Sequence, residues 1–188
     1  MPSYQNTPAI PSQELLDRNA KYAENHKPKL GDDHWGHIPH NAVITCMDSR
    51  INPHEQLGLG VNDTAIIRNG GGAVAELVTT ILAAQEFGVR HFMVLKHTDC
   101  GGFHLQGSEI IEHFKTRAKD PKAIDEVIAR VKEFGFGSAT IEEVVLSDVE
   151  FLRKSPLIFE ETEISGWVLD DTTGKVCEWL EEQLEKEY

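Results

Sequence analysis

The chain of 188 residues is 40% hydrophobic and 26% charged, which is enough for one globular domain with a core of its own. Its formal net charge of -13 argues against nucleic acid as a partner, because that affinity rests largely on neutralising phosphates with Lys and Arg. No apolar run approaches the roughly 20 residues that span a bilayer. With no signal or transit peptide apparent and only three cysteines, we expect a cytoplasmic protein without a membrane partner.

The first 30 residues predict an N-terminal arm and helix within a single domain that spans residues 1–188. Ser12 is a plausible N-cap before Leu15 and Leu16, and the helix is expected to end by Pro28. Its apolar face is narrow. A narrow-faced helix ahead of the main domain often packs on a partner subunit.

Three short apolar runs rich in β-branched residues predict buried parallel strands. These runs cover residues 41–46, 64–69 and 91–96. Apolar residues at helical spacing over 73–87, ended by Gly88, predict a helix between the second and third strands. Strand, helix and strand in this order predict a right-handed parallel crossover.

The second half of the chain predicts further helices and one more strand. The expected elements are a helix over 109–134 broken near Pro121, a turn at 135–137, a helix over 141–154, a strand over 164–170 and an acidic helix face over 178–187. The fold class is therefore α/β, with a mostly parallel central β-sheet flanked by helices. In such sheets ligands sit at the carboxyl ends of the strands.

Two short polar segments stand at the ends of predicted strands and carry Cys46, His97 and Cys100. Zinc accepts sulfur and nitrogen ligands tetrahedrally, and three protein ligands leave a fourth position open. An open position is typical of catalytic zinc, whose bound water can lose a proton near neutral pH. The sequence thus predicts one catalytic Zn²⁺, with hydroxide on the metal as the nucleophile.

Other interpretations of these residues exist. A single cysteine or histidine is more often a core residue than a ligand, and only the three together at strand ends favour a metal. A structural or sensory zinc in a non-catalytic interaction protein remains an alternative, as does a redox couple of Cys46 and Cys100, although no C-x-x-C is present. Cys177 has no nearby His or second Cys and is expected to be structural.

Asp48 and Arg50 lie close enough around a tight turn for a contact that keeps the Asp48 carboxylate ionised. Beside a metal, such a carboxylate can accept a hydrogen bond from the nucleophile and orient it. The alternative is a surface salt bridge without a functional role.

The segment Arg68-Asn69-Gly70-Gly71-Gly72 ends the second predicted strand and leads into a helix. Its glycines allow close approach of the backbone and its N–H groups favour an anion, so Gly70 and Gly71, together with Gly101 and Gly102, are candidates for binding substrate or an anionic product such as bicarbonate. The spacing does not match a dinucleotide turn. His104, after the second glycine pair, is a candidate for relaying protons to bulk water.

The motifs C-x-D-x-R, R-N-G-G-G and H-x-x-C-G-G, in this order, resemble the β-class carbonic anhydrase family over about residues 40–104. Gly-Trp-Val-Leu-Asp at 166–170 resembles the last core strand of that family. The family often has Ala where Gly70 stands, and the segment after Cys100 is shorter here than in plant-type members. This compact pattern is similar to the subgroup that also includes carbonyl sulfide hydrolases.

The resemblance implies that Cys46, His97 and Cys100 ligate one zinc per subunit and that Asp48 and Arg50 act as a dyad. It implies a homodimer or homotetramer in which the N-terminal helix wraps a neighbour. Asp48 would also be able to replace water on the metal, as in some family members. Two reactions are open, namely reversible hydration of carbon dioxide to bicarbonate and hydrolysis of carbonyl sulfide to carbon dioxide and hydrogen sulfide.

Overall fold

The computed structural model describes residues 10–27, 39–60, 63–132 and 134–179. The chain divides into two compact units, Met1–Gly36 and His37–Tyr188, which are described separately. The first contains the helix α1 (Ser12–Ala23). Ser12 is its first helical residue and Pro11 occupies the N-cap position, so the predicted capping role of Ser12 is not observed. Residues 1–9 of the predicted N-terminal arm lie outside the described residues.

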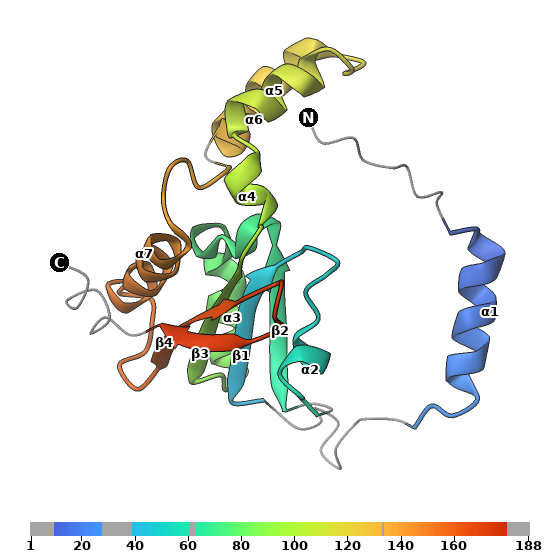
Figure 1. Cartoon of the computed structure of the whole chain (residues 1–188), viewed down its shortest axis with the longest axis vertical. Helices are drawn as coiled ribbons and strands as arrows, with labels where there is room; N and C mark the ends of the chain where they lie inside the picture. Colours follow the sequence, from blue (N-terminus) through green and yellow to red (C-terminus); the bar gives the residue numbers. More distant parts are fainter. Residues whose placement is uncertain (1–9, 28–38, 61–62, 133, 180–188) are drawn as a thin grey trace. The chain divides into compact units, whose positions relative to one another are not determined.

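The second unit is built on a five-stranded sheet with the strand order β2-β1-β3-β4-β5 (Figure 1). The strands are β1 (Asn41–Cys46), β2 (Thr64–Asn69), β3 (His91–His97), β4 (Glu163–Leu169) and β5 (Val176–Trp179). The first four run parallel, and β5 pairs antiparallel with β4. The three strands predicted from apolar runs, the strand predicted over 164–170 and the mostly parallel sheet are confirmed.

Strand register brings the functional residues to one edge. Cys46, the last residue of β1, pairs with Asn69, and His97, the last residue of β3, pairs with Leu169. Parallel strands whose last residues pair in register end at the same edge of the sheet. The segments that follow β1, β2, β3 and β4 therefore start side by side.

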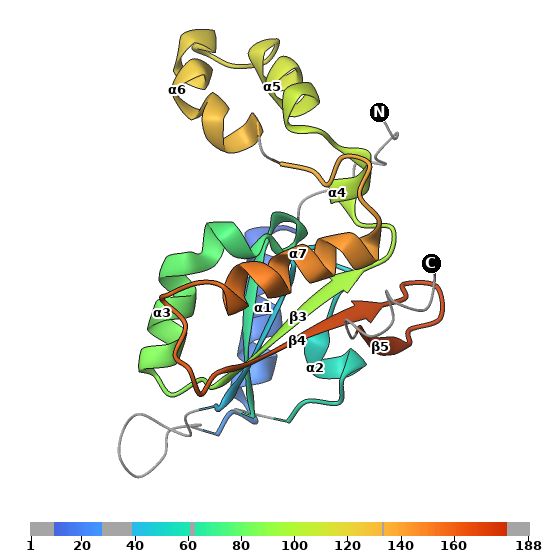
Figure 2. The same cartoon turned by 90° about the vertical axis from the view of Figure 1, so that its left-hand side faces the viewer.

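Two helices cover one face of the sheet, α3 (Val78–Glu86) and α7 (Ile141–Arg153), as Figure 2 shows. The main core lies between these helices and the strands and includes Phe92 and Val94 of β3. Gly166 of β4 lets α7 approach, because a Cβ there would lie 2.4 Å from Cγ1 of Val145. This burial of apolar surface is the main stabilising term for the unit.

The helix predicted over 73–87 is divided in the structure. A short 3₁₀ turn η1 (Gly70–Gly72) is followed by a second, η2 (Val74–Leu77), and only then by α3. Leu77 has φ -105° and ψ 7°, which lies outside the α-helical region and separates η2 from α3.

A smaller core cluster lies on the opposite face, with Val43, Leu95 and Leu169 packed near the short helix α2 (Pro53–Gln56). Side chains alternate between the two faces along a strand. Because Val94 belongs to the main core and Leu95 to the smaller one, Lys96 points toward the α7 face and His97 toward the other.

The helix predicted over 109–134 is two helices, α5 (Gly107–Lys115) and α6 (Pro121–Lys132), which pack on each other. The break falls at the predicted position. A short helix α4 (Gly101–His104) precedes them. Gly135 and Gly137 have φ values of +100° and +60°, which explains glycine in the predicted turn.

Of the acidic helix face predicted over 178–187, only residues 178 and 179 are described, and they lie on the strand β5. Cys177, also on β5, is exposed. Residues 180–188 lie outside the described residues. No helix in the described ranges is long and apolar enough to cross a membrane.

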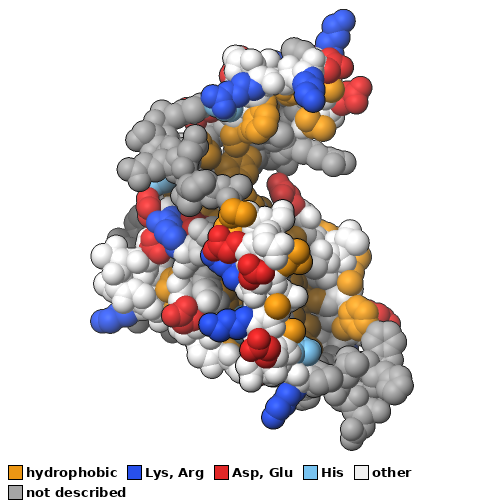
Figure 3. Space-filling model, turned by 90° about the vertical axis from the view of Figure 1, so that its right-hand side faces the viewer, with side chains coloured by type: hydrophobic (Ala, Val, Ile, Leu, Met, Phe, Trp, Pro, Cys, Tyr) orange, Lys and Arg blue, Asp and Glu red, His pale blue; other side chains and the backbone are white. Residues whose placement is uncertain are grey.

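On the face in Figure 3, the Lys and Arg side chains of the described residues stand among acidic ones rather than in one continuous basic area.

Candidate metal centre

Three side chains that the sequence predicts to meet lie together at the carboxyl edge of the sheet. The ligand atoms of Cys46, His97 and Cys100 are all within 4.8 Å of one another, and the three residues are buried. The two sulfur atoms are 3.8 Å apart. Two sulfurs bonded at about 2.3 Å to one tetrahedral metal also lie about 3.8 Å apart. The cluster therefore has the spacing of a metal site.

The tautomer of His97 follows from its contacts. Nδ1 lies 2.9 Å from the carbonyl oxygen of Thr98, which can only accept a hydrogen bond, so the proton sits on Nδ1. Nε2 is buried, and among the described residues it has no hydrogen-bond partner. A buried nitrogen lone pair without a partner, fixed by a bond at the other nitrogen, is the usual state of a histidine that ligates a metal.

The pKa values of the Cys46 and Cys100 thiols are shifted in opposite directions. The Cys100 thiol donates toward Cys46 Sγ, and this bond is the largest cause that lowers the pKa of Cys46. The same bond, followed by burial, raises the pKa of Cys100. A metal held by both sulfurs would displace the protons that they carry, because the thiolate is the form that binds a metal.

These donors fit zinc. Two sulfurs and one imidazole nitrogen form a soft donor set that zinc accepts, and a carboxylate two residues after Cys46 lies close by without belonging to the cluster of three. The unpartnered His97 nitrogen supports the same assignment. The arrangement can hold one zinc ion with a position left for a small molecule.

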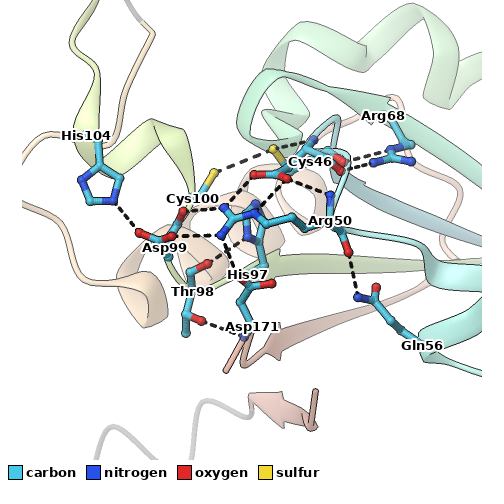
Figure 4. A network of polar contacts seen from close by, with 11 residues as sticks. Cys46, Arg50, Gln56, Arg68, His97, Thr98, Asp99, Cys100, His104 and Asp171 are labelled. Atoms are coloured by element: carbon cyan, nitrogen blue, oxygen red, sulfur yellow. Dashed lines mark hydrogen bonds and ion pairs between the residues drawn. The ribbon is translucent and has the colours of Figure 1, made fainter. Parts of the chain in front are cut away.

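Arg50 connects the ends of three strands beside this cluster (Figure 4). It forms a two-point contact with the Asp48 carboxylate, at 3.1 Å from Nε and 2.8 Å from Nη2. Its Nη1 donates to carboxylates of Asp99 at 2.9 Å and Asp171 at 2.6 Å. The predicted contact between Asp48 and Arg50 is present, and it is part of a network rather than an isolated surface pair.

The network fixes the charge of Asp48. The hydrogen bonds from the Arg50 side chain lower the pKa of Asp48 to about 2, against the effect of burial. The carboxylate of Asp48 also raises the pKa of Arg50, and Arg50 in turn lowers the pKa of Asp99. At neutral pH Asp48 is therefore ionised and can only accept hydrogen bonds.

Arg68 of β2 holds the turn that carries Asp48. Arg68 donates to the carbonyl oxygen of Cys46 at 2.9 Å and to that of Asp48 at 2.6 Å. The Asp48 N–H in turn approaches Cys46 Sγ at 3.4 Å. Arg68 thus fixes the backbone between a candidate ligand and the candidate orienting carboxylate.

Aromatic rings cover three of the four glycines proposed to bind an anion. A Cβ at Gly70 would lie 2.9 Å from the Phe134 ring, and Cβ atoms at Gly71 and Gly102 would lie 2.9 Å and 2.4 Å from the Phe136 ring. A side chain at any of these three positions would therefore force the rings to move. The same residues line a cavity of about 280 Å³ next to α7. Their role in binding an anion stays a prediction.

Gly101 and Gly102 offer a matched test of this packing. Gly102→Ala is expected to destabilise the fold by about 1–3 kcal/mol, because the new methyl group would overlap the Phe136 ring. Gly101→Ala, where nothing lies within 4 Å of the added Cβ, is expected to change stability by less than about 0.5 kcal/mol. Urea denaturation of both variants measures this difference, and equal stability of the two would contradict it.

His104 on α4 lies at the outer end of the Arg50 network. Its Nε2 is 2.9 Å from Oδ1 of Asp99, whose other oxygen contacts Arg50. The exposed imidazole is therefore linked through two residues to Asp48. Transfer of protons along this path stays a prediction.

Sequence reasoning missed two carboxylates of the network and one buried cation. Asp171 follows β4 at the same edge as the other strand ends, so the rule that found Cys46 would also have found it. Asp99 stands between two candidate ligands and has a left-handed backbone with φ +53°. Lys96 gave no signal, because nothing in a strand sequence shows that a lysine is buried.

Comparisons with known proteins agree with this geometry. Residues 41–176 match the family model described as carbonic anhydrase. The carbon disulfide hydrolase of Acidianus sp. (strain A1-3) is 31% identical over 159 residues, covering 74% of this chain and 78% of that protein. Beta-carbonic anhydrase 1 of Mycobacterium tuberculosis (strain ATCC 25618 / H37Rv) is 28% identical over 176 residues, covering 89% and 96%.

Solved structures show the same fold. The carbonic anhydrase from Glaciozyma antarctica matches with a TM-score of 0.76 and 29% identity, covering 90% of this chain and 98% of that one. The carbonic anhydrase of Streptococcus mutans matches with a TM-score of 0.74 and 30% identity, covering 93% and 100%. The family model spans most of the chain and includes the buried Cys-His-Cys cluster, and the chain belongs to the β-class carbonic anhydrase family.

Proposed function

We propose that this chain is a zinc enzyme that adds water to a small linear molecule with a carbon between two double bonds, and that its principal reaction is the reversible hydration of carbon dioxide to bicarbonate. The observation that carries the proposal is the buried cluster of Cys46, His97 and Cys100 with an ionised carboxylate at its edge. Bound there, zinc would supply a Lewis acid that lowers the pKa of water to about 7.

Asp48 and Arg50 orient the attacking oxygen. Asp48, ionised at neutral pH, accepts a hydrogen bond from that oxygen and so directs a lone pair at the substrate carbon. Arg50 holds the carboxylate at two points, which prevents it from turning away. The proton released by the reaction leaves through solvent, and His104 is the candidate acceptor.

A backbone N–H near the cluster would receive the negative charge that develops on the substrate oxygen. The backbone N–H groups of Gly101 and Gly102, which follow the candidate ligand Cys100 at the start of α4, are the candidates for this donor.

A sulfur-containing substrate is the second candidate. Carbonyl sulfide is a linear analogue of carbon dioxide, and attack on its carbon would give carbon dioxide and hydrogen sulfide. The observation that favours it is that three relatives at 27–31% identity are carbon disulfide hydrolases.

The assembly we propose is a cytoplasmic homodimer or homotetramer with one zinc per subunit. Leu15, Leu16 and Tyr22 of α1 are all more than 45% exposed, and the whole helix has no buried residue. A partner subunit would cover this apolar surface. One solved relative with the same fold, from Sordaria macrospora, is described as tetrameric.

Assays on one zinc-replete preparation distinguish between the candidate substrates. Proton release from carbon dioxide and sulfide release from carbonyl sulfide and carbon disulfide are compared as kcat/KM. The proposal predicts carbon dioxide hydration above background. Sulfide release at the rate of buffer alone would remove the second candidate. If the chain binds one equivalent of zinc but acts on none of the three substrates, the result would favour the alternative of a non-catalytic zinc protein.

A further inference from the structure

A buried lysine lies beside the metal centre, and the mechanism above does not use it. Lys96 precedes the candidate ligand His97 on β3, and it is only 3% exposed. Burying an ammonium group is costly unless it is paired and fully hydrogen-bonded. The contacts of Lys96 therefore have to be accounted for.

All three N–H donors of the ammonium group have acceptors. Nζ donates to the carbonyl oxygens of Gly71 at 3.1 Å and Gly72 at 2.7 Å, and to the carboxylate of Asp148 on α7 at 2.5 Å. The face of the Phe136 ring lies 5.7 Å away. The carboxylate of Asp148 alone would neutralise the charge of Lys96. The two carbonyl contacts show that Lys96 also fixes the turn between β2 and α3.

The conformation of that turn has to be stabilised by other contacts, because two successive residues in it have a left-handed backbone conformation. Gly71 has φ +70° and Gly72 has φ +63°. A Cβ at Gly72 would lie 2.9 Å from the backbone of Thr45, so the turn is pressed against the end of β1. Glycine permits this conformation but does not specify it, because glycine adopts many others as readily.

The turn packs against the backbone of a candidate ligand. A Cβ at Gly72 would lie 3.2 Å from the backbone nitrogen of Cys46, and the N–H of Met47 donates to the carbonyl oxygen of Asn69, the residue before the turn, at 2.8 Å. The turn is thus held on one side by Lys96 and packs on the other side against the end of β1. Surroundings that fix the backbone of a metal ligand also orient the ligand.

We propose that Lys96 is a positioning residue of the metal centre, whose buried ammonium fixes the 70–72 turn so that the turn stays packed against the backbone of Cys46. The inference rests on the proposed function, because it assumes zinc at the cluster. Lys96 does not touch the reacting atoms. It acts through the turn, with Asp148 as its anchor.

The test compares Lys96→Met with Gln85→Met. Gln85 is also a buried polar residue, and it holds Leu157 and Phe159 through hydrogen bonds of 3.0 Å and 2.9 Å, outside the metal cluster. Both variants are expected to lower stability in urea. Zinc affinity, measured by competition with a chelator, is expected to fall about 10- to 100-fold for Lys96→Met only. The Co²⁺-substituted Lys96→Met protein should show a shifted sulfur-to-metal charge-transfer band.

Three outcomes overturn the proposal. If Lys96→Met keeps the zinc affinity and cobalt spectrum of the unchanged protein, Lys96 has only a structural role. If both variants lose zinc affinity equally, the loss reflects general destabilisation. If Lys96→Met does not fold, Asp148→Ala removes the anchor instead, and unchanged zinc affinity in that variant rejects the role. A wild-type chain that binds no zinc at all would reject the proposed function itself.

Discussion

Cys46→Ser is expected to reduce zinc content from one ion per chain to less than about 0.1 and to reduce carbon dioxide hydration to the rate of buffer alone. The serine hydroxyl is a poor replacement for a thiolate, because it stays protonated near neutral pH and zinc prefers sulfur here. The change is nearly isosteric, so the fold should remain. Zinc is measured by atomic emission on the purified protein, together with circular dichroism.

The same substitution at the exposed cysteine provides the control. Cys177 lies on β5 and takes no part in the cluster of three. Cys177→Ser should keep one zinc ion per chain and the full rate. If Cys46→Ser retained stoichiometric zinc, the ligand assignment would be wrong.

Asp48→Asn is expected to lower kcat/KM about 10- to 100-fold while zinc content stays at one ion per chain. Asparagine keeps the shape of the side chain, but it removes the negative charge that Arg50 stabilises. It therefore accepts a weaker hydrogen bond from the nucleophile. Steady-state rates near pH 8, with zinc measured on the same samples, separate a loss of orientation from a loss of metal.

Asp125→Asn is the matched control, because Asp125 is an exposed carboxylate on α6. It should leave both the rate and the zinc content unchanged. A full rate in Asp48→Asn would show that the carboxylate does not orient the nucleophile, and the contact with Arg50 would then be structural.

The predicted sheet and the predicted cluster depend on the same sequence signal. Apolar β-branched runs locate the buried strands β1, β2 and β3, and the polar residues that end a run are placed at the edge by parallel pairing. Cys46 and His97 could be brought together in this way because they end neighbouring strands. Their meeting follows from topology, and no detail of side-chain packing is needed.

The surroundings of the cluster could not be predicted in the same way. The rings of Phe134 and Phe136 reach the glycines from a turn more than 30 residues further along the chain than Gly102. Lys96 occupies a position in β3 where an apolar residue would fit the pattern, and only tertiary contacts show that its charge is paired. Packing between distant segments decides both features, and local periodicity carries no information about it.

The glycines illustrate how one residue type can support two explanations. In the sequence, Gly70 and Gly71 indicate close approach of a small anion to the backbone. In the structure, the space beside their Cα atoms is filled by aromatic rings. The turn over residues 70–72 also packs against the end of β1, so it still bears on the site.

X-ray absorption at the zinc K-edge of the purified protein tests the central claim most directly, because it counts the atoms bound to the metal. The account predicts two sulfur ligands at about 2.3 Å and two lighter ligands at about 2.0–2.1 Å, one of them the imidazole nitrogen of His97. The Cys46→Ser sample should lack this signal because it holds almost no zinc. A shell with three or four sulfurs, or one without sulfur, would contradict a zinc held by Cys46, His97 and Cys100 with one open position.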